Sequence, residues 1–446
     1  MTLPMIFALA ITVLMIVLIM IDKLPFGVPP LIACLLMVVF QVVDIKVAFG
    51  GFANSTIVML AAFMAVIAAL QKTSLITRFK ALIVDMASRG GFKAYVLIVL
   101  VVMLGASLFG TGSTAYYVLV IGLLSTLPYS KLLPPSRVLM PAGFAANHPL
   151  APFNVALQYG IVMAVLQSTG FTQRVDLVKF AVVNFILSIG FLVWCLVAYR
   201  VLPDHAIADT SAGHAGDTAA GDADGVSGGG VATATATATQ VAALLTKRQE
   251  YVTYASFAIA VIGMVLQSYI GDAGYAITGL AVAILLISNV LNFTEIRDAI
   301  SQPIILMSAG VIGIADALGA TGLTKLVGTT VAGMLGTNVS PFILVFAFCV
   351  LTSVLATLTG STLGTVYVFA PLAIATCMQL GLNPTAAAAA IVVAGWNGHF
   401  LPIDGMPAMI MGAGKYTLIQ FWKFTVPMYF IRLLVLTAGA LLLFPM

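Results

Sequence analysis

Long apolar runs, separated by short polar or charged stretches, set the pattern of this chain. A membrane-spanning helix needs about 20 apolar residues, and these runs are of that length. They fall at residues 3–22, 25–43, 53–71, 138–165 and 176–200 in the first half, and at 251–270, 274–292, 302–320, 385–412 and 426–445 in the second. The pattern therefore predicts five membrane-spanning helices in each half.

Two further apolar stretches, 94–127 and 341–378, are too long for one simple span and share a polar string near their middle. Thr111-Gly112-Ser113-Thr114 interrupts the first stretch, and Thr359-Gly360-Ser361-Thr362 interrupts the second. Hydrocarbon tolerates such a break only where it is buried in protein or lines a wet cavity. Each stretch fits either a re-entrant hairpin with a polar tip or a broken helix that crosses fully.

The two halves align with each other around these strings. Ala69–Leu75 matches Ala317–Leu323, and the polar string follows 38 positions after Thr73 in one copy and after Thr321 in the other. A shared spacing without gaps between two polar motifs is uncommon among apolar helices, so we infer an internal duplication. Corresponding interruptions in two halves are the sequence pointer to a transporter's binding site.

An odd number of crossings in each half requires the second copy to be inserted upside down. Lysine and arginine gather in the loops of one side, which the positive-inside rule makes cytoplasmic: Lys23, Lys72, Arg78, Lys80, Arg89, Lys93, Lys131, Arg137, Arg200, Lys247, Arg248, Arg297 and Lys415. The other side carries Lys46, Arg174, Lys179 and Lys325. Both termini are then expected outside the inner (plasma) membrane, and the first span is read as a retained helix.

The expected architecture is an all-α polytopic membrane protein with two inverted-topology repeats, each of five transmembrane helices plus one re-entrant hairpin. The repeats cover 1–202 (scaffold 3–71, hairpin 94–127, transport helices 138–200) and 249–446 (scaffold 251–320, hairpin 341–378, transport helices 385–445). Residues 203–248 between them are rich in Ala, Gly, Asp and Thr and cannot bury enough apolar surface to fold. We expect a disordered cytoplasmic linker, whose His205 and His214 carry no function.

Composition supports the membrane class. Hydrophobic residues make up 61% of the 446 residues and charged residues only 8%, against about 25% charged in a soluble domain. The net charge of +4 comes from loop residues and does not indicate a nucleic-acid partner.

The chemistry of the two polar strings suits a small anion. Glycine allows close backbone approach and the hydroxyl groups donate or accept hydrogen bonds. Helix N-termini favour anions, and helix C-termini favour cations. We therefore predict substrate-binding residues Gly112, Ser113, Thr114, Gly360, Ser361 and Thr362, with Asn154 from the helix that follows. Hydroxyls bonding back to their own helices are the structural alternative.

A second polar cluster follows each hairpin, in 138–165 and 385–412. Prolines and glycines among these residues predict that both helices unwind inside the membrane and free carbonyl groups for a cation. We predict that the coupling ion, Na⁺ or H⁺, is held by Thr111, Asn147, Thr359, Asn397 and Asp404. His399 and His148 are candidate proton relays, although a buried structural hydrogen bond is the plainer reading of His148.

Asp404 is the residue that most strongly indicates a functional site, because a charged carboxylate inside a membrane span is energetically costly. Its structural alternative is a helix cap. Arg432 is expected to reach the cytoplasmic face by extending along its helix.

The chain resembles the divalent anion/sodium symporter family, which carries dicarboxylates, citrate or sulfate. The resemblance covers nearly the whole chain and rests on Phe52-Ala53-Asn54-Ser55-Thr56, Lys72-Thr73-Ser74-Leu75, the two tips, and Leu401-Pro402-Ile403 running into Gly412-Ala413-Gly414-Lys415. Members carry Ser-Asn-Thr at each tip, where this chain has Gly-Ser-Thr, and a Thr-Pro-Pro-Asn signature that here reads Ala151-Pro152-Phe153-Asn154 and Gly405-Met406-Pro407-Ala408. The resemblance implies a divergent member, a homodimer built on the scaffold, and tips that bind carboxylate.

The predicted function is cation-coupled symport of a small anion, a di- or tricarboxylate or similar, by carrying the hairpin domain across the bilayer against the scaffold. A proton-coupled antiporter or an uncoupled exchanger, for example of sulfate or sulfonate with Asp404 as ion carrier, is the alternative. The chain has no metal-ligand spacing, Ser/His/Asp arrangement or phosphate loop that would indicate an enzyme, and no cofactor is expected beyond the coupling ion. Two hairpins that enter the membrane without crossing it would block a continuous pore, and this disfavours a channel.

Overall fold

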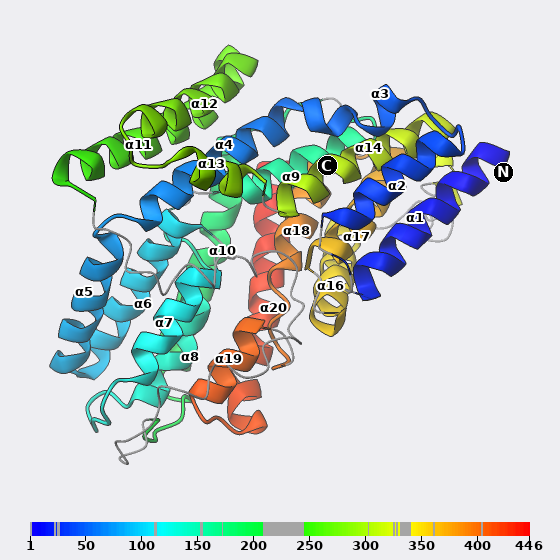
Figure 1. Ribbon diagram of the computed structural model, residues 1–446. Coiled ribbons are helices and arrows are strands. Elements are labelled where there is room, and N and C mark those ends of the chain that lie inside the picture. The colour runs from blue at the N-terminus through cyan, green and yellow to red at the C-terminus, as the bar shows by residue number, and fades with distance from the viewer. Residues whose placement is uncertain are drawn as a thin grey trace.

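The computed structural model describes residues 2–21, 24, 27–110, 114–151, 155–171, 173–207, 245–301, 303–323, 326, 329–330, 340–359, 362–402 and 405–446 (Figure 1). All regular secondary structure within these residues is helical. The all-α expectation is therefore confirmed.

The first half contains ten α-helices and one short 3₁₀ helix, η1, in its described part. Their bounds are α1 Leu3–Ile21, α2 Val28–Val39, α3 Ile45–Ala48, η1 Gly50–Ala53, α4 Ser55–Gln71, α5 Leu75–Arg89, α6 Gly91–Phe109, α7 Thr114–Ser125, α8 Pro135–Ala145, α9 Ala156–Ser168 and α10 Leu177–Ala198. The polar string 111–114 interrupts the stretch as predicted: α6 ends at Phe109, and α7 begins at Thr114, the last residue of the string.

The second half follows the same order. Its helices are α11 Lys247–Ile270, α12 Asp272–Ile287, α13 Phe293–Ile300, α14 Pro303–Thr321, α16 Pro341–Thr359, α17 Thr362–Gln379, α18 Thr385–Gly395, α19 Gly405–Ala413 and α20 Leu418–Leu443. Corresponding elements start at nearly constant offsets: 248 positions separate Thr114 from Thr362 (362 − 114), and 250 separate Pro135 from Thr385 (385 − 135).

Six described helices are long and apolar enough to cross a membrane, namely α6, α10, α11, α16, α17 and α20. Three of these, α6, α16 and α17, are arms of the expected hairpins, whereas the fourth arm, α7, has 12 residues. The number of crossings and the re-entrant form of the hairpins stay predictions.

The predicted spans 138–165 and 385–412 are each split into two helices. α8 ends at Ala145 and α9 begins at Ala156, while α18 ends at Gly395 and α19 begins at Gly405. Pro149 lies in the first break and Pro402 in the second, where a missing N–H and a fixed φ prevent helix continuation; Pro152 lies outside the described residues. The expected unwinding of both spans is thus confirmed.

Helices from the two halves pack reciprocally. α2 of the first half packs against α14 of the second, and α12 of the second half packs against α4 of the first (Figure 1). Likewise, α9 packs against α17 and α18, and α19 packs against α7 and α8, while α10 runs beside α20. Each half therefore completes the core of the other.

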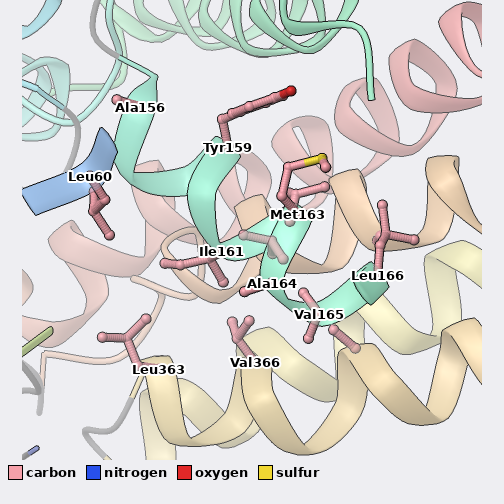
Figure 2. Packing of buried hydrophobic residues seen from close by; sticks show 14 of the residues in the cluster. Leu60, Ala156, Tyr159, Ile161, Met163, Ala164, Val165, Leu166, Leu363 and Val366 are labelled. Atoms are coloured by element: carbon pink, nitrogen blue, oxygen red, sulfur yellow. The ribbon is translucent and has the colours of Figure 1, made fainter. Parts of the chain in front are cut away.

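Small and branched side chains make this close packing possible. Ala386 to Ala390 of α18 are all 0% exposed, and such small residues let helix backbones approach each other. Figure 2 shows α9 directing Ile161 and Val165 towards Leu363 and Val366 of α17. The broken span of the first half is thereby fixed beside the second hairpin.

The predicted linker 203–248 is partly described, and its described ends pack against the protein. Ser136 donates to the carbonyl oxygen of Pro203 (3.0 Å), and His205 Nε2 lies 2.9 Å from the carbonyl oxygen of Gly414. Ile207 is 4% exposed. The ordered body thus extends to residue 207, α11 begins at Lys247, and residues 208–244 lie outside the described residues.

Candidate functional site

The two helix breaks meet in the interior. Asn147 Nδ2 donates to the carbonyl oxygen of Trp396 over 3.2 Å, which joins the break after α8 to the break after α18. The rings of Phe144 and His399 lie 5.9 Å apart. Four predicted site residues, Asn147, His148, Asn397 and His399, are thus brought to one buried junction, and each is at most 9% exposed.

Polar side chains at the junction add a second donor to carbonyl groups in the last turns of α8 and α18. His148 Nδ1 lies 2.8 Å from the carbonyl oxygen of Phe144, in the last turn of α8. Asn397 Nδ2 donates to the carbonyl oxygen of Val393 (2.7 Å) at the end of α18. The same two carbonyl groups also accept from backbone N–H groups, of Asn147 (3.0 Å) and Trp396 (3.2 Å), so the side chains reinforce the turns that end both helices inside the protein.

The second break is held close against α16. A Cβ added at Gly398 would overlap Thr357 Oγ1 and lie 2.7 Å from the carbonyl oxygen of Ser353. Glycine is therefore required here by the close approach of the backbone. The next residue, His399, adopts a φ of +28°, which is uncommon for a residue with a side chain.

Arg432 enters the junction, contrary to the sequence expectation. It is 0% exposed and lies near the middle of α20, which runs from Leu418 to Leu443. Its Nη2 donates to the carbonyl oxygen of Asn397 (2.8 Å), and its Nη1 lies 3.3 Å from His148 Nε2. The expectation that Arg432 extends to the cytoplasmic face was wrong, because acceptors inside the protein draw the side chain inwards.

These contacts define the state of His148. A ring nitrogen facing a carbonyl oxygen must donate, so Nδ1 carries the proton and Nε2 accepts from Arg432. The imidazole also stacks on Phe191 of α10, with ring centroids 3.9 Å apart. Both ring nitrogens of His148 and one face of its ring are therefore in contact, which agrees with the prediction of a buried structural hydrogen bond. Its role as a proton relay stays a prediction.

The first tip residues Thr111, Gly112 and Ser113 lie outside the described residues, as does the side chain of Thr114. The described helices on either side, α6 and α7, are in contact near this string. Tyr116 donates through its hydroxyl to the carbonyl oxygen of Val102 (2.8 Å), and its ring stacks on Phe109 at 5.1 Å. Since Tyr116 reaches back to a residue 14 positions earlier, the start of α7 lies against α6, which fits a hairpin; the choice between a hairpin and a broken helix that crosses fully stays a prediction.

At the second tip, Gly360 and Ser361 and the side chain of Thr359 lie outside the described residues. Thr362 begins α17 and lies next to the end of α18: a Cβ added at Gly395 would overlap Val366 and lie 3.3 Å from Thr362 Cγ2. Because Gly395 directly precedes Trp396 and Asn397, the start of α17 lies next to the junction of the two breaks.

Two predicted site residues cannot be placed. Asn154 precedes α9 and Asp404 precedes α19, and both lie outside the described residues. Their roles in substrate and ion binding stay predictions. Among the described residues, no group of three or more His, Cys, Asp or Glu side chains is arranged to hold a metal ion.

Sequence reasoning missed two residues of this region. Arg432 could have been found as a charge at the centre of an apolar helix, a position that points to function by default. Gln158 of α9 is 2% exposed, and neither polar atom of its amide has a hydrogen-bond partner among the described residues. Nothing in the sequence distinguishes Gln158 from a glutamine that faces a neighbouring polar group.

Comparisons with known proteins agree with a transport fold. Residues 16–394 match the citrate transporter family, CitMHS. The fold is similar to that of the YdaH transporter of Alcanivorax borkumensis (TM-score 0.61, 16% identity, 89% of this chain and 87% of that chain). It is also similar to Neisseria gonorrhoeae MtrF, described as an antimetabolite efflux pump (TM-score 0.58, 14% identity, 91% and 83%).

No curated protein matched the chain significantly. The comparisons do not single out the divalent anion/sodium symporter family that the motifs resemble.

Proposed function

Because this chain belongs to the citrate transporter family and is a secondary transporter of organic anions, we propose that it carries a di- or tricarboxylate by cation-coupled symport. It is a transporter and not an enzyme. Citrate is the first candidate, because the matching family is described as citrate transporters.

The meeting of the two helix breaks carries this proposal. The contact of Asn147 with Trp396 joins segments that are 249 positions apart in the sequence, and it does so inside the protein. Among the described residues, His399 Nδ1 and Arg432 Nε at the junction are buried without a hydrogen-bond partner, and imidazole and guanidinium groups donate hydrogen bonds to oxygen anions. The start of α17 lies beside it, and the N-terminus of a helix favours negative charge.

We propose that the two tips and Asn154 complete the substrate site. Gly112, Ser113, Thr114, Gly360, Ser361 and Thr362 then supply hydroxyl and backbone groups from both hairpins. The first hairpin's fold-back at Tyr116 and the position of Thr362 beside Gly395 support this assignment.

The coupling cation is assigned to the same junction. Thr111, Asn147, Thr359, Asn397 and Asp404 are the proposed residues, because carbonyl and carboxylate oxygens beside broken helices are the ligands that transporters use for Na⁺. Asp404 would carry the proton if the ion is H⁺. No further cofactor is proposed.

The matching order of helices and their reciprocal packing support two inverted repeats. We propose that hairpins α6–α7 and α16–α17 move with the split helices as one body against a scaffold of α1–α4 and α11–α14. The proposed assembly is a homodimer joined through that scaffold, with both termini outside the inner membrane and the central linker in the cytoplasm.

The test is uptake into proteoliposomes of succinate, citrate, tartrate, sulfate and a sulfonate, with Na⁺ and pH gradients imposed separately. We expect cation-dependent uptake of a carboxylate. Ser113→Ala and Ser361→Ala should each abolish it while the protein still accumulates, and normal uptake by both would refute the tip site. Asp404→Asn should alter the dependence on Na⁺ or pH; an unchanged dependence would make Asp404 structural.

A counterflow experiment, in which the proteoliposomes are preloaded with an anion, distinguishes an antiporter or exchanger from a symporter. The structural similarity to MtrF, an efflux pump, gives export a reason to be tested. Uptake that needs an internal anion and no cation gradient would favour exchange over symport.

A further inference from the structure

Arg432 is a positive charge at the centre of the protein. It stands 14 positions after the first residue of α20 and 11 before the last (432 − 418 and 443 − 432). α20 packs against α10, α16 and α18, and Figure 1 shows it in the middle of the fold. Both ends of the helix are therefore too distant for this fully buried side chain to reach water.

The charge of Arg432 is not balanced by a described carboxylate. Its two polar contacts, the carbonyl oxygen of Asn397 and the Nε2 atom of His148, are neutral acceptors. The ion pairs of the described residues lie elsewhere and do not include Arg432. Because a buried charge is strongly unfavourable unless it is paired, the site favours the arrival of a negative group.

The guanidinium also keeps an open edge. Arg432 Nε is buried and has no hydrogen-bond partner among the described residues. The contacts at Nη1 and Nη2 fix the plane of the group, since His148 is itself held by Phe144 and Phe191. A guanidinium edge that presents Nε–H beside an Nη–H matches the two oxygens of a carboxylate.

We propose that Arg432 binds a carboxylate group of the transported anion through this edge, and that the substrate's charge balances the buried guanidinium. The inference rests on the proposed function, because it takes the cargo to be a carboxylate. Arg432 is 0% exposed, so the anion reaches it only when the core opens. The ion pair then forms in a low-dielectric interior, where it is stronger than in water.

The competing role is a structural one, in which Arg432 only clamps the two helix breaks together through His148 and Asn397. Loss of the clamp would impair all substrates alike. Loss of a charge that meets the substrate would instead weaken multivalent carboxylates more than monovalent ones, because each additional carboxylate adds to the attraction.

The experiment measures the dissociation constants of citrate, succinate and pyruvate for the purified full-length protein, together with proteoliposome uptake. Arg432→Gln should weaken citrate binding by about 10- to 100-fold, as expected for a charged hydrogen bond, and pyruvate binding by clearly less. Tyr429→Phe, one turn earlier on α20, removes the contact with Ser353 (2.9 Å) and serves as a control for disturbance of this helix. It should leave the ratio of the citrate and pyruvate constants unchanged.

Arg432→Lys keeps the charge and removes the fork of donors, and it tests the contact with the anion if Arg432→Gln does not accumulate; the comparison of citrate with pyruvate in Arg432→Gln separates that contact from the clamp. Arg432→Lys should weaken all three ligands while preserving their order. Unchanged citrate binding in Arg432→Lys or Arg432→Gln, or equal weakening of citrate and pyruvate in Arg432→Gln, would overturn the proposal. Wild-type protein that transports no carboxylate would instead refute the proposed function.

Discussion

Gly398 offers a sharp test of how the second helix break is held. Gly398→Ala adds one methyl group where the backbone touches α16. That methyl would overlap Thr357 Oγ1 and lie 2.7 Å from the carbonyl oxygen of Ser353. Ordinary van der Waals contact begins at 3.4 Å, so the Ser353 carbonyl must withdraw by 0.7 Å (3.4 − 2.7).

The displaced groups belong to a hydrogen-bonded chain. The Ser353 carbonyl oxygen accepts from Thr357 Oγ1 (2.8 Å), and the Ser353 hydroxyl contacts the Tyr429 hydroxyl (2.9 Å). Overpacking costs about 1–3 kcal/mol and one lost hydrogen bond about 1 kcal/mol, so we expect a loss of about 2–4 kcal/mol. Because Asn397 precedes Gly398 and accepts from Arg432, substrate binding should weaken as well.

Thermal unfolding of the purified protein, followed together with citrate binding, measures both effects. Gly122→Ala is the matched control: it lies in α7 with no atom within 4 Å of the added Cβ, and it should raise stability by about 0.5–1 kcal/mol. Combining Gly398→Ala with Thr357→Ala removes the overlapping oxygen and should recover part of the loss. A Gly398→Ala protein as stable as wild type would refute the close packing.

Three further predictions address other parts of the fold. Tyr116→Phe keeps the ring stack with Phe109 but loses the bond to Val102, so stability should fall by about 1 kcal/mol; no change in the melting temperature would argue against the fold-back of α7. Lys72 binds Glu295 (2.6 Å) and the Val290 carbonyl (3.1 Å) across the halves. Lys72→Met should cost up to about 1 kcal/mol, and adding Glu295→Gln should cost little more; additive losses in this double-mutant cycle would refute the pairing. Gln158→Leu removes a buried amide that has no partner in the described part of the chain and should raise stability by about 1–3 kcal/mol, whereas a lower melting temperature would show that the amide is satisfied.

The fold was predictable where hydrophobicity and helix-breaking residues act locally. Apolar runs predicted the helices, and the polar string predicted the interruption between α6 and α7 because it removes apolar side chains from a span. Prolines at 149, 152 and 402 predicted the two split helices. Helix lengths were less predictable: α2 has only 12 residues within the predicted span 25–43, because an apolar loop residue looks the same as an apolar helix residue.

The site was predictable only in part. Asn147, His148, Asn397 and His399 were recognised from polarity within apolar runs, and the structure brings them together. Arg432 was misjudged because the direction of a long side chain depends on acceptors that come from other helices. The acceptors of Arg432 lie 284 and 35 positions away in the sequence, and no local pattern reveals them.

The reciprocal packing of the two halves bears on how such a chain could arise. α9 is seated on α17 and α18, and α19 is seated on α7 and α8. Under the proposed duplication, a single-length ancestor would have had no partner of its own for these surfaces and would have built this core by pairing two copies. Joining the copies in one chain would then let each half change alone, as at Arg432 of α20, since α10 contains no arginine.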